Sequence, residues 1–192
     1  MRKTPRQARS QATVAAILEA GTRILAEEGW SGFTTNKVAA RAGVGIGSLY
    51  QYFPDKLSLV AAIRTHHLDE CLAVMRRATA GGKPLDVFVG DLVAGLIAAH
   101  RRHPGLHRVL LDEAPNAEGF RNPNSEFEQD YLECYRSAVA PFRSAAAGGG
   151  AAALIVSDAI DGVIHNAARR GMLEAPDLQQ ELVRMITAYL AS

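Results

Sequence analysis

The sequence has few of the residues that build disulfide frameworks or membrane spans. Its 192 residues include two cysteines, Cys71 and Cys134, which are too few for a framework and suit a reducing cytoplasm. Nothing electropositive flanks either thiol, which argues against a redox sensor. No apolar run approaches the roughly 20 residues of a membrane span, and the N-terminus lacks the apolar core of a signal sequence. We therefore expect a cytoplasmic protein without membrane association.

Patterns for catalysis, metals and cofactors are also lacking. Residues 43–47 superficially resemble a dinucleotide-binding loop, but the third glycine is missing at the right offset and no strand precedes them. His100, His103 and His107 lie close in sequence, but Pro104 breaks the helix between them, which favours surface or interhelical histidines over a metal site. No nucleophile lies in a recognisable pattern with a base. We expect no catalytic residues, no metal and no cofactor.

The sequence has little net charge, but charges of the two signs are unevenly distributed along it. The net charge is +1, yet residues 1–56 carry eight Lys/Arg against four Asp/Glu, a net +4, and residues 57–192 carry thirteen against sixteen, a net −3. Phosphate attraction is the dominant sequence-independent term in DNA binding, so the basic end is where DNA would bind. The N-terminus is a basic arm with Arg2, Lys3, Arg6 and Arg9. This arm either contacts phosphates or a minor groove, or it is a solvated tail, and both interpretations remain open.

Apolar residues recur at helical spacing along the chain, and nowhere do they alternate as in strands, so the sequence predicts an all-α protein. The first helix ends at Gly29, and Trp30 and Phe33 are expected to cover its inner face. Further helices are predicted over 55–79, from Pro84 to about 103, briefly near 106–110, over 125–142 with a capping box of Ser125 and Glu128, over about 153–167, and from Pro176. Residues 145–153 are predicted to be a low-complexity connector.

The most informative stretch is FTTNKVAARAGVGIGSLYQYFPDK, residues 33–56. Thr34 or Thr35 can cap a first helix, and Gly43 falls where a helix ends in the left-handed conformation. A second helix places Leu49 and Phe53 four residues apart on an inner face. This pattern predicts a helix-turn-helix over 33–52, whose second helix lies in the DNA major groove.

The side chains of the second helix suit that role. Ser48 and Gln51 can form hydrogen bonds with base edges, and Tyr50 and Tyr52 can donate to phosphates. Gly45 and Gly47 remove side chains where the backbone approaches the duplex. In addition, Lys56 places a cation at the N-terminus of the next helix, where backbone N–H groups attract phosphate. An ordinary helical hairpin is the alternative for this stretch alone.

The pattern TT-x-x-VA-x-x-AGV-x-x-GSLYQYFPDK closely resembles the DNA-binding motif of the tetracycline-repressor (TetR) family of bacterial regulators. The resemblance implies DNA contacts at Thr35, Asn36, Ile46, Gly47, Ser48, Tyr50, Tyr52 and Lys56. Two residues depart from the family pattern. Gly45 stands where a hydroxyl residue often caps the recognition helix, so that cap comes from backbone or water. Ile46 is apolar where a polar side chain is common.

The resemblance also implies a layout. A DNA-binding domain at 9–69 is joined by the long helix to a larger helical ligand-binding and dimerisation domain at 70–192. The last two helices would form a homodimer interface with Val156, Ile160, Val163, Ile164, Leu182, Met185 and Tyr189. The binding site for an apolar or aromatic effector would be lined by Phe88, Leu92, Leu110, Phe127, Tyr131 and Tyr135, with ordinary core packing as the alternative for each.

The implied function is a transcriptional regulator of the repressor type, which a small molecule releases from double-stranded operator DNA. A DNA-binding protein controlled by a protein partner or acting on chromosome architecture is the first alternative, and a helical enzyme is a remote one. Asp158, Asp161, His165 and Arg169 share one helix face, and we favour a solvated face with i,i+4 pairs over polar anchors in a cavity.

Overall fold

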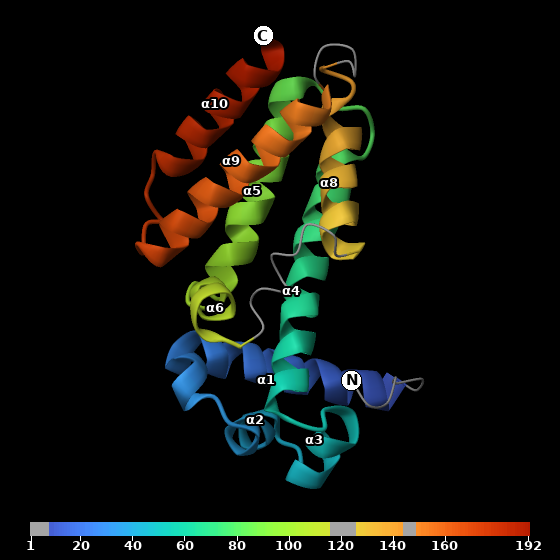
Figure 1. Cartoon of the computed structure of the whole chain (residues 1–192), viewed down its shortest axis with the longest axis vertical. Coiled ribbons are helices and arrows are strands. Elements are labelled where there is room, and N and C mark those ends of the chain that lie inside the picture. Colours follow the sequence, from blue (N-terminus) through green and yellow to red (C-terminus); the bar gives the residue numbers. More distant parts are fainter. Residues whose placement is uncertain (1–7, 116–125, 144–148) are drawn as a thin grey trace. The chain divides into compact units, whose positions relative to one another are not determined.

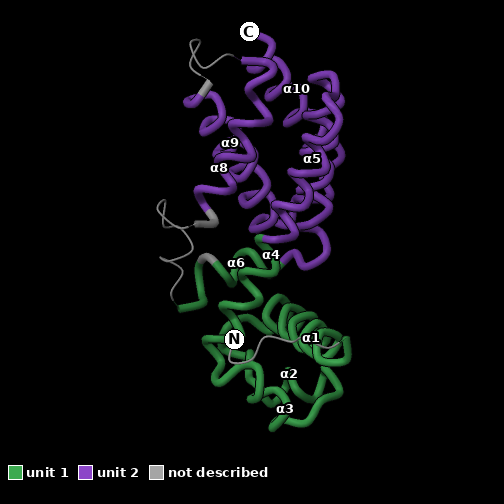
Figure 2. Tube along the Cα trace, turned by 90° about the vertical axis from the view of Figure 1, so that its right-hand side faces the viewer, with its two compact units in different colours: residues 1–68, 105–117 green, residues 69–104, 118–192 purple. Residues whose placement is uncertain are grey.

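The computed structural model describes residues 8–115, 126–143 and 149–192, and the chain forms two compact units. Unit 1 contains residues 1–68 and 105–117, and unit 2 contains residues 69–104 and 118–192 (Figure 2). A division at a single position, as predicted at 69/70, therefore misses the return of residues 105–117 to the first unit. The described residues form helices and no strand, which confirms the predicted all-α class.

Unit 1 contains the predicted helix-turn-helix. Helices α1 (Ala8–Gly32), α2 (Thr35–Ala42) and α3 (Ile46–Tyr52) are joined later in the chain by α6 (Leu106–Arg108) and a π-helical turn, η1 (Val109–Glu113) (Figure 1). The helix α1 contacts α2, α6 and η1. The core they share includes Ile17, Leu25, Phe33, Val38, Leu49, Phe53, Leu106, Val109 and Leu110. This core holds α3 by its inner face and leaves its other face to solvent.

The local signals around the turn are as predicted. The Thr34 hydroxyl accepts a hydrogen bond from the backbone N–H of Lys37 at 3.3 Å, so Thr34 is the cap of α2. Gly43 adopts the left-handed conformation, with φ 67° and ψ 28°. Gly45 precedes α3 without a side-chain cap. Because these features depend on residues close in sequence, they could be predicted without knowledge of the tertiary fold.

Helix α4 (Lys56–Thr79) contributes to both units. At its start, the Ser58 backbone N–H donates to a carboxylate oxygen of Asp55 at 2.7 Å, and the Asp55 N–H donates to the Ser58 hydroxyl at 3.2 Å. This reciprocal cap satisfies two donors that the helix itself leaves open. The first half then contributes Leu59, Val60 and Ile63 to the core of unit 1. The second half contributes Cys71, Leu72, Val74, Met75 and Ala78 to the core of unit 2.

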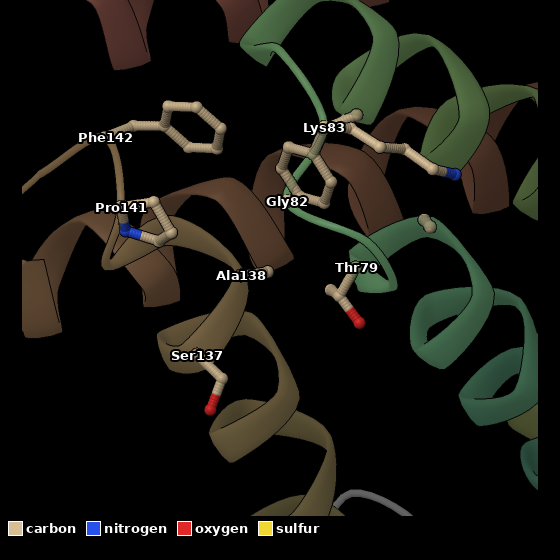
Figure 3. Close-up of a pocket in the computed structure, with 9 residues that line it drawn as sticks. Thr79, Gly82, Lys83, Ser137, Ala138, Pro141 and Phe142 are labelled. Atoms are coloured by element: carbon tan, nitrogen blue, oxygen red, sulfur yellow. The ribbon is translucent and has the colours of Figure 1, made fainter.

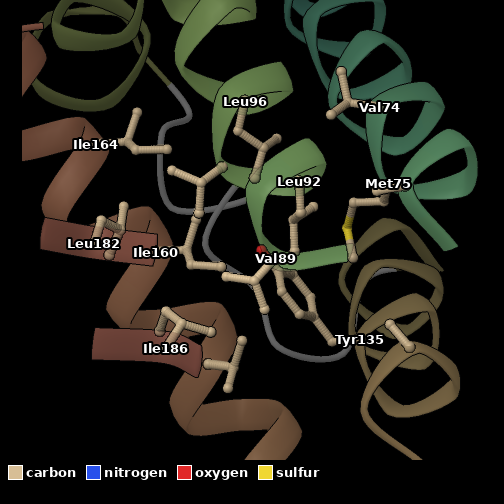
Figure 4. Close-up of a cluster of buried hydrophobic side chains, with 14 of the residues drawn as sticks. Val74, Met75, Val89, Leu92, Leu96, Tyr135, Ile160, Ile164, Leu182 and Ile186 are labelled. Atoms are coloured by element: carbon tan, nitrogen blue, oxygen red, sulfur yellow. The ribbon is translucent and has the colours of Figure 1, made fainter. Parts of the chain in front are cut away.

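Unit 2 is completed by α5 (Leu85–Arg102), α8 (Glu126–Val139), α9 (Gly149–Arg169) and α10 (Leu178–Ala191). Helices α5, α9 and α10 contact one another, and α8 packs on α9 (Figure 1). Their apolar faces converge on an interior that includes Leu92, Tyr135, Ile160 and Ile186 (Figure 4). Burying aliphatic side chains contributes roughly 1.5–3 kcal/mol each, so this interior is the main stabilising feature of unit 2.

Helix α9 differs from the sequence prediction in two respects. It begins at Gly149, so the second part of the predicted connector is helical, whereas residues 144–148 and the predicted cap Ser125 lie outside the described residues. Its residues 150–169 are also long and apolar enough to cross a membrane, judged by length and composition alone. Val156, Ile160 and Ile164 are buried among the other helices of unit 2. This packing accounts for the apolar face of α9.

Candidate functional site

The helix-turn-helix presents most of the predicted DNA contacts at the surface of unit 1. Thr35 and Ser48 are half-buried, and the exposed members are Asn36, Gly45, Ile46, Gly47, Tyr50 and Gln51. Tyr52 differs, because only 7% of it is exposed and it belongs to the core. The end of α3 therefore anchors the helix, and its first turns, together with Tyr50 and Gln51, form the accessible face.

A hydrogen bond ties the two helices of the motif together on this face. The hydroxyls of Thr35 in α2 and Tyr50 in α3 lie 3.0 Å apart. Both were predicted as DNA contacts, and their pairing fixes the distance between two hydroxyl groups that can also bond to phosphate oxygens. The face is thus held by hydrogen bonding as well as by the core beneath it.

The cations of α2 are paired with acids of α1. Lys37 donates to Glu28 and to the backbone carbonyl of Gly32, the latter at 3.0 Å. Arg41 pairs with Glu27 at 2.6 Å. Exposed ion pairs of this kind contribute little to stability, about 0–1 kcal/mol. Their main consequence is that they offset much of the positive charge beside the motif.

Lys56 has a different environment. Its ammonium donates to the Trp30 carbonyl at 2.9 Å and lies 3.5 Å from the centroid of the Trp30 ring. Burial lowers the pKa of Lys56 from its usual value. The sequence pattern predicts only a core role for Trp30 and gives no indication of this contact with Lys56. The signal that could have suggested it was the presence of the only tryptophan just before the motif.

The predicted ligand-binding residues do not all come together. Phe88, Leu92, Tyr131 and Tyr135 belong to the core of unit 2, but Leu110 belongs to the core of unit 1. Leu110 is therefore not part of the same lining. The reason is that the chain returns to unit 1 after α5, which helical periodicity cannot reveal. The side chain of Phe127 lies outside the described residues.

A small hollow lies at one end of unit 2, between the end of α4 and the end of α8. It encloses about 140 Å³ and is lined by Ala78, Thr79, Gly82, Lys83, Phe88, Ser137, Ala138, Pro141 and Phe142 (Figure 3). The Phe88 and Phe142 rings stack with centroids 5.8 Å apart. Ligand pockets usually measure roughly 300–1,000 Å³, so this hollow accommodates a small group and not a large molecule.

A polar cluster lies inside unit 2. The Tyr131 hydroxyl donates to Asp161 at 2.8 Å, and the Tyr135 hydroxyl lies 3.5 Å from that of Tyr131. Burial raises the pKa of Asp161 to about 7, and it raises the pKa of both tyrosines. Asp161 is half-buried and accepts a hydrogen bond from Tyr131, so the favoured interpretation of a solvated face does not hold for Asp161, whereas Asp158 is exposed. The periodicity of α9 could not show that α8 places a hydroxyl against this carboxyl group.

Of the predicted histidines, His100 and His107 each take part in a contact with another histidine ring, whereas His103 is half-buried at the end of α5. In unit 1, a ring nitrogen of His107 lies 3.1 Å from one of His67. In unit 2, a ring nitrogen of His100 lies 2.8 Å from the Leu96 carbonyl, and its ring packs against that of His165. Each unit therefore contains a histidine pair, one of which joins α4 to α6 and the other α5 to α9.

Models of two protein families match the chain. The first, described as bacterial regulatory proteins of the tetR family, matches residues 17–63. The second, described as a tetracyclin repressor-like C-terminal domain, matches residues 84–190, more than half of the chain. The two matches cover the helix-turn-helix and most of unit 2.

Individual proteins are also similar. The HTH-type transcriptional repressor KstR of Mycolicibacterium smegmatis is 36% identical over 117 residues, covering 60% of this chain and 55% of KstR. The chain spans about half the length of the curated relatives it matches first. A putative TetR-family regulator from Rhodococcus sp. has a TM-score of 0.75 at 20% identity, covering 95% of this chain and 100% of its own. FadR from Bacillus subtilis, solved with stearoyl-CoA, has a TM-score of 0.72 at 18% identity, covering 93% and 97%.

The raised pKa of Asp161 leads to a prediction about stability. Because the folded state holds this proton up to about pH 7 and the unfolded chain loses it near pH 4, stability falls as the pH rises through this window. We expect Asp161→Asn to be more stable than wild type at about pH 8, by roughly 1 kcal/mol or more, or about 2–4 °C in Tm, with little gain at about pH 4. Thermal unfolding followed by circular dichroism measures the difference.

The matched control is Asp158→Asn, which neutralises an exposed carboxylate three residues earlier on the same helix. It should show no comparable pH-dependent gain. Equal stability changes for the two variants at both pH values would show that folding does not raise the pKa of Asp161.

Proposed function

We propose that this chain, which belongs to the tetR family of bacterial regulatory proteins, is a sequence-specific transcriptional repressor that binds double-stranded operator DNA as a cytoplasmic homodimer. The observation that carries the proposal is the exposed face of α3, which is anchored from below by Leu49, Tyr52 and Phe53. Similarity to KstR supports the repressor role. A regulatory and not a catalytic role follows from the same family membership.

The accessible face of α3 suits the major groove. Ser48 and Gln51 offer a hydroxyl and an amide, which recognise base edges, and exposed Ile46 offers an apolar contact for a thymine methyl group. Gly47 adds no side chain, and an added Cβ there would meet no atom within 4 Å. The backbone of α3 can therefore approach the duplex closely.

The first prediction from the proposed function separates sequence preference from affinity. We expect Ser48→Ala and Gln51→Ala to change which sequence is preferred, at a cost of about 1–3 kcal/mol for each lost base contact. Tyr50→Phe should instead weaken binding to all sequences, since it removes a hydroxyl that can bond to phosphate. Selection from a random DNA pool, followed by affinity measurements, distinguishes the two effects. An unchanged preference in both Ser48→Ala and Gln51→Ala would remove these residues from base recognition.

The dimer interface is best assigned to the outer face of α9. The predicted interface residues Val156, Ile160, Ile164 and Leu182 are already buried in the core of unit 2, so their apolar character is explained without a partner. Val163 and Tyr189 are partly buried, and Met185 is exposed. On the outer face, Ile155, Ala159 and Gly162 follow one another at helical spacing, and Ile155 is 49% exposed.

Several observations support that face as the interface. A surface hollow of about 400 Å³ runs along it, lined by Asp158, Ala159, Gly162, Val163, Asn166, Ala167, Arg170, Met172 and Leu178. Met172, at its edge, is 50% exposed. Small residues let two helices approach closely, and the symmetric pairing of two copies would cover the exposed apolar side chains. A dimer is needed because one recognition helix contacts only a few base pairs.

The second prediction tests this assignment. Ile155→Asp should yield monomers and abolish operator binding, because an unpaired charge would be buried between the two copies. The matched control is Leu154→Asp, since Leu154 is equally exposed at 47% but points about 100° away around the helix. Sedimentation measures the assembly. A dimeric Ile155→Asp variant would place the interface elsewhere.

We infer that the effector binds inside unit 2. Aliphatic and aromatic side chains surround Tyr131, Tyr135 and Asp161, so an apolar or aromatic molecule with one polar group would suit this interior. FadR is a fold neighbour whose structure contains stearoyl-CoA, which supports an apolar effector. Helix α4 can carry the signal, because one continuous helix contributes to both cores. A tilt of α4 would change the separation of the two recognition helices, which must stay near one DNA turn, ~34–36 Å.

The small volume of the hollow favours a second candidate. With about 140 Å³ at the Phe88 and Phe142 rings, that site admits no large ligand without movement of the surrounding helices. A repressor controlled by a protein partner would need no larger cavity. The two candidates differ in whether a small molecule changes DNA affinity.

The third prediction concerns linkage between the two ligands. Titration of stearoyl-CoA, followed by calorimetry with and without operator DNA, should give weaker binding in the presence of DNA, by about 5- to 150-fold, because coupling is reciprocal. Decanoic acid, which shares the apolar chain type, serves as a smaller probe. Equal affinities with and without DNA, or no binding of either probe, would favour control by a partner and leave DNA binding unaffected.

A further inference from the structure

The end of α1 contains a break that exposes one backbone donor. Gly29 has φ 69° and ψ −175°, which are not helical, although Trp30 to Gly32 continue the element. The break frees the Trp30 backbone N–H from the helical ladder, and this N–H donates to a carboxylate oxygen of Glu113 at 3.0 Å. Glu113 lies 83 residues further along the chain, at the end of η1. A distant carboxylate thus acts as the cap of the last turn of α1.

Two glycines allow this contact. A Cβ on Gly29 would lie 2.8 Å from the same Glu113 oxygen, and its positive φ also disfavours other residues. A Cβ on Gly105 would lie 2.3 Å from the Ala26 carbonyl oxygen. Backbone of the returning segment therefore packs directly on α1. Movement of this segment away from Trp30 would remove the packing of Gly105 on α1.

Glu113 is itself held in place. Arg108, five residues earlier, forms an ion pair with it. The π turn between them is closed by the Ala114 N–H, which donates to the Val109 carbonyl at 2.8 Å. In addition, Arg64 of α4 donates to the Leu110 carbonyl at 3.2 Å. The carboxylate is presented to Trp30 by a segment that is fixed at both ends.

Trp30 in turn holds Lys56. The carbonyl of Trp30 accepts one ammonium proton, and its ring faces the same ammonium at 3.5 Å, within the range of a cation–π contact. The Phe33 ring, stacked on that of Trp30, lies 5.7 Å from the ammonium. An ammonium has three donors, so at least one remains for an outside acceptor. The flexible lysine side chain is thereby fixed in one position at the start of α4.

We propose that Trp30 and Glu113 are positioning residues for DNA binding, because they fix the Lys56 ammonium where it contacts a phosphate. The inference rests on the proposed function, since it assigns Lys56 a phosphate partner. It adds that phosphate affinity depends on a carboxylate in η1, which resemblance to the DNA-binding motif does not include. Loss of Glu113 releases the Trp30 N–H, loosens the last turn of α1 and lets the lysine side chain leave its position.

The test uses the salt dependence of DNA affinity, which a purely stabilising residue would not change. Each phosphate neutralised by a cation contributes about 0.9 to the slope of log K against log salt. Losing Lys56 from both copies of a dimer should reduce the slope by about 1.8, so that affinity falls roughly tenfold less between about 50 and 200 mM salt. Removal of a residue that only stabilises unit 1 lowers the folded fraction and leaves the slope unchanged.

We expect Glu113→Ala to reduce the slope as much as Lys56→Ala, and the double variant to show no further reduction. Glu113→Gln, which keeps an oxygen that can accept from the Trp30 N–H, should retain most of the wild-type slope. The matched control is Glu133→Ala, which removes an exposed carboxylate that pairs with Arg136 on unit 2. A wild-type slope in Glu113→Ala, or an additional reduction in the double variant, would overturn the proposal.

Fluorescence provides a second measurement that needs no DNA and no Glu113 variant. Trp30 is the only tryptophan, so its emission reports on the ammonium and carboxylate around it. Emission of Lys56→Ala should differ from that of wild type, and identical spectra would show that the contact is absent in solution. If wild type bound no DNA at any salt concentration, the proposed function would fail as a whole. Normal DNA binding with unchanged slopes would remove only the positioning role.

Discussion

Helix α4 is the element on which both units depend, because it supplies side chains to two separate cores. Leu59 and Ile63 are fully buried in unit 1, and Met75 is fully buried in unit 2. A helix of 24 residues measures ~36 Å, and rotating it would displace apolar side chains in both cores at once. Close-packed cores respond to such a shift by moving between discrete arrangements and not by gradual deformation. Continuity of this helix is therefore the physical basis for the coupling that the proposed effector response requires.

Lys56 lies at that start, where two kinds of interaction meet. The reciprocal cap of Asp55 and Ser58 fixes the first turn of α4, and Trp30 fixes the lysine side chain. The other cations beside the motif, Lys37 and Arg41, are paired with acids of α1. Some of the positive charge in unit 1 therefore forms ion pairs that attach α2 to α1. The net positive charge of the N-terminal part gives no indication of which cation remains available to phosphate.

The interior of unit 2 shows how one polar group changes the character of an apolar core. Asp161 accepts a hydrogen bond from Tyr131, yet burial still raises the pKa of its carboxyl group to about 7. The apolar surroundings of this half-buried group solvate a negative charge poorly, so the carboxyl group retains its proton to a higher pH. An ionised carboxyl group at this position destabilises the fold, so a ligand that paired with it would gain binding free energy there. The proposed effector site is based on this property.

The sequence by itself determined the features that depend on neighbouring residues. A threonine cap at Thr34 or Thr35, the left-handed Gly43, the missing cap at Gly45 and the helical periodicity all follow from local backbone chemistry, and together they establish the all-α class and the helix-turn-helix. Only the tertiary structure decided which surfaces meet. Periodicity shows that α9 has an apolar face, but not that this face is covered by the chain's own helices, as Ile160 is. Likewise, no local signal joins Glu113 to Trp30, since a contact across 83 residues exists only once the chain has folded back on α1.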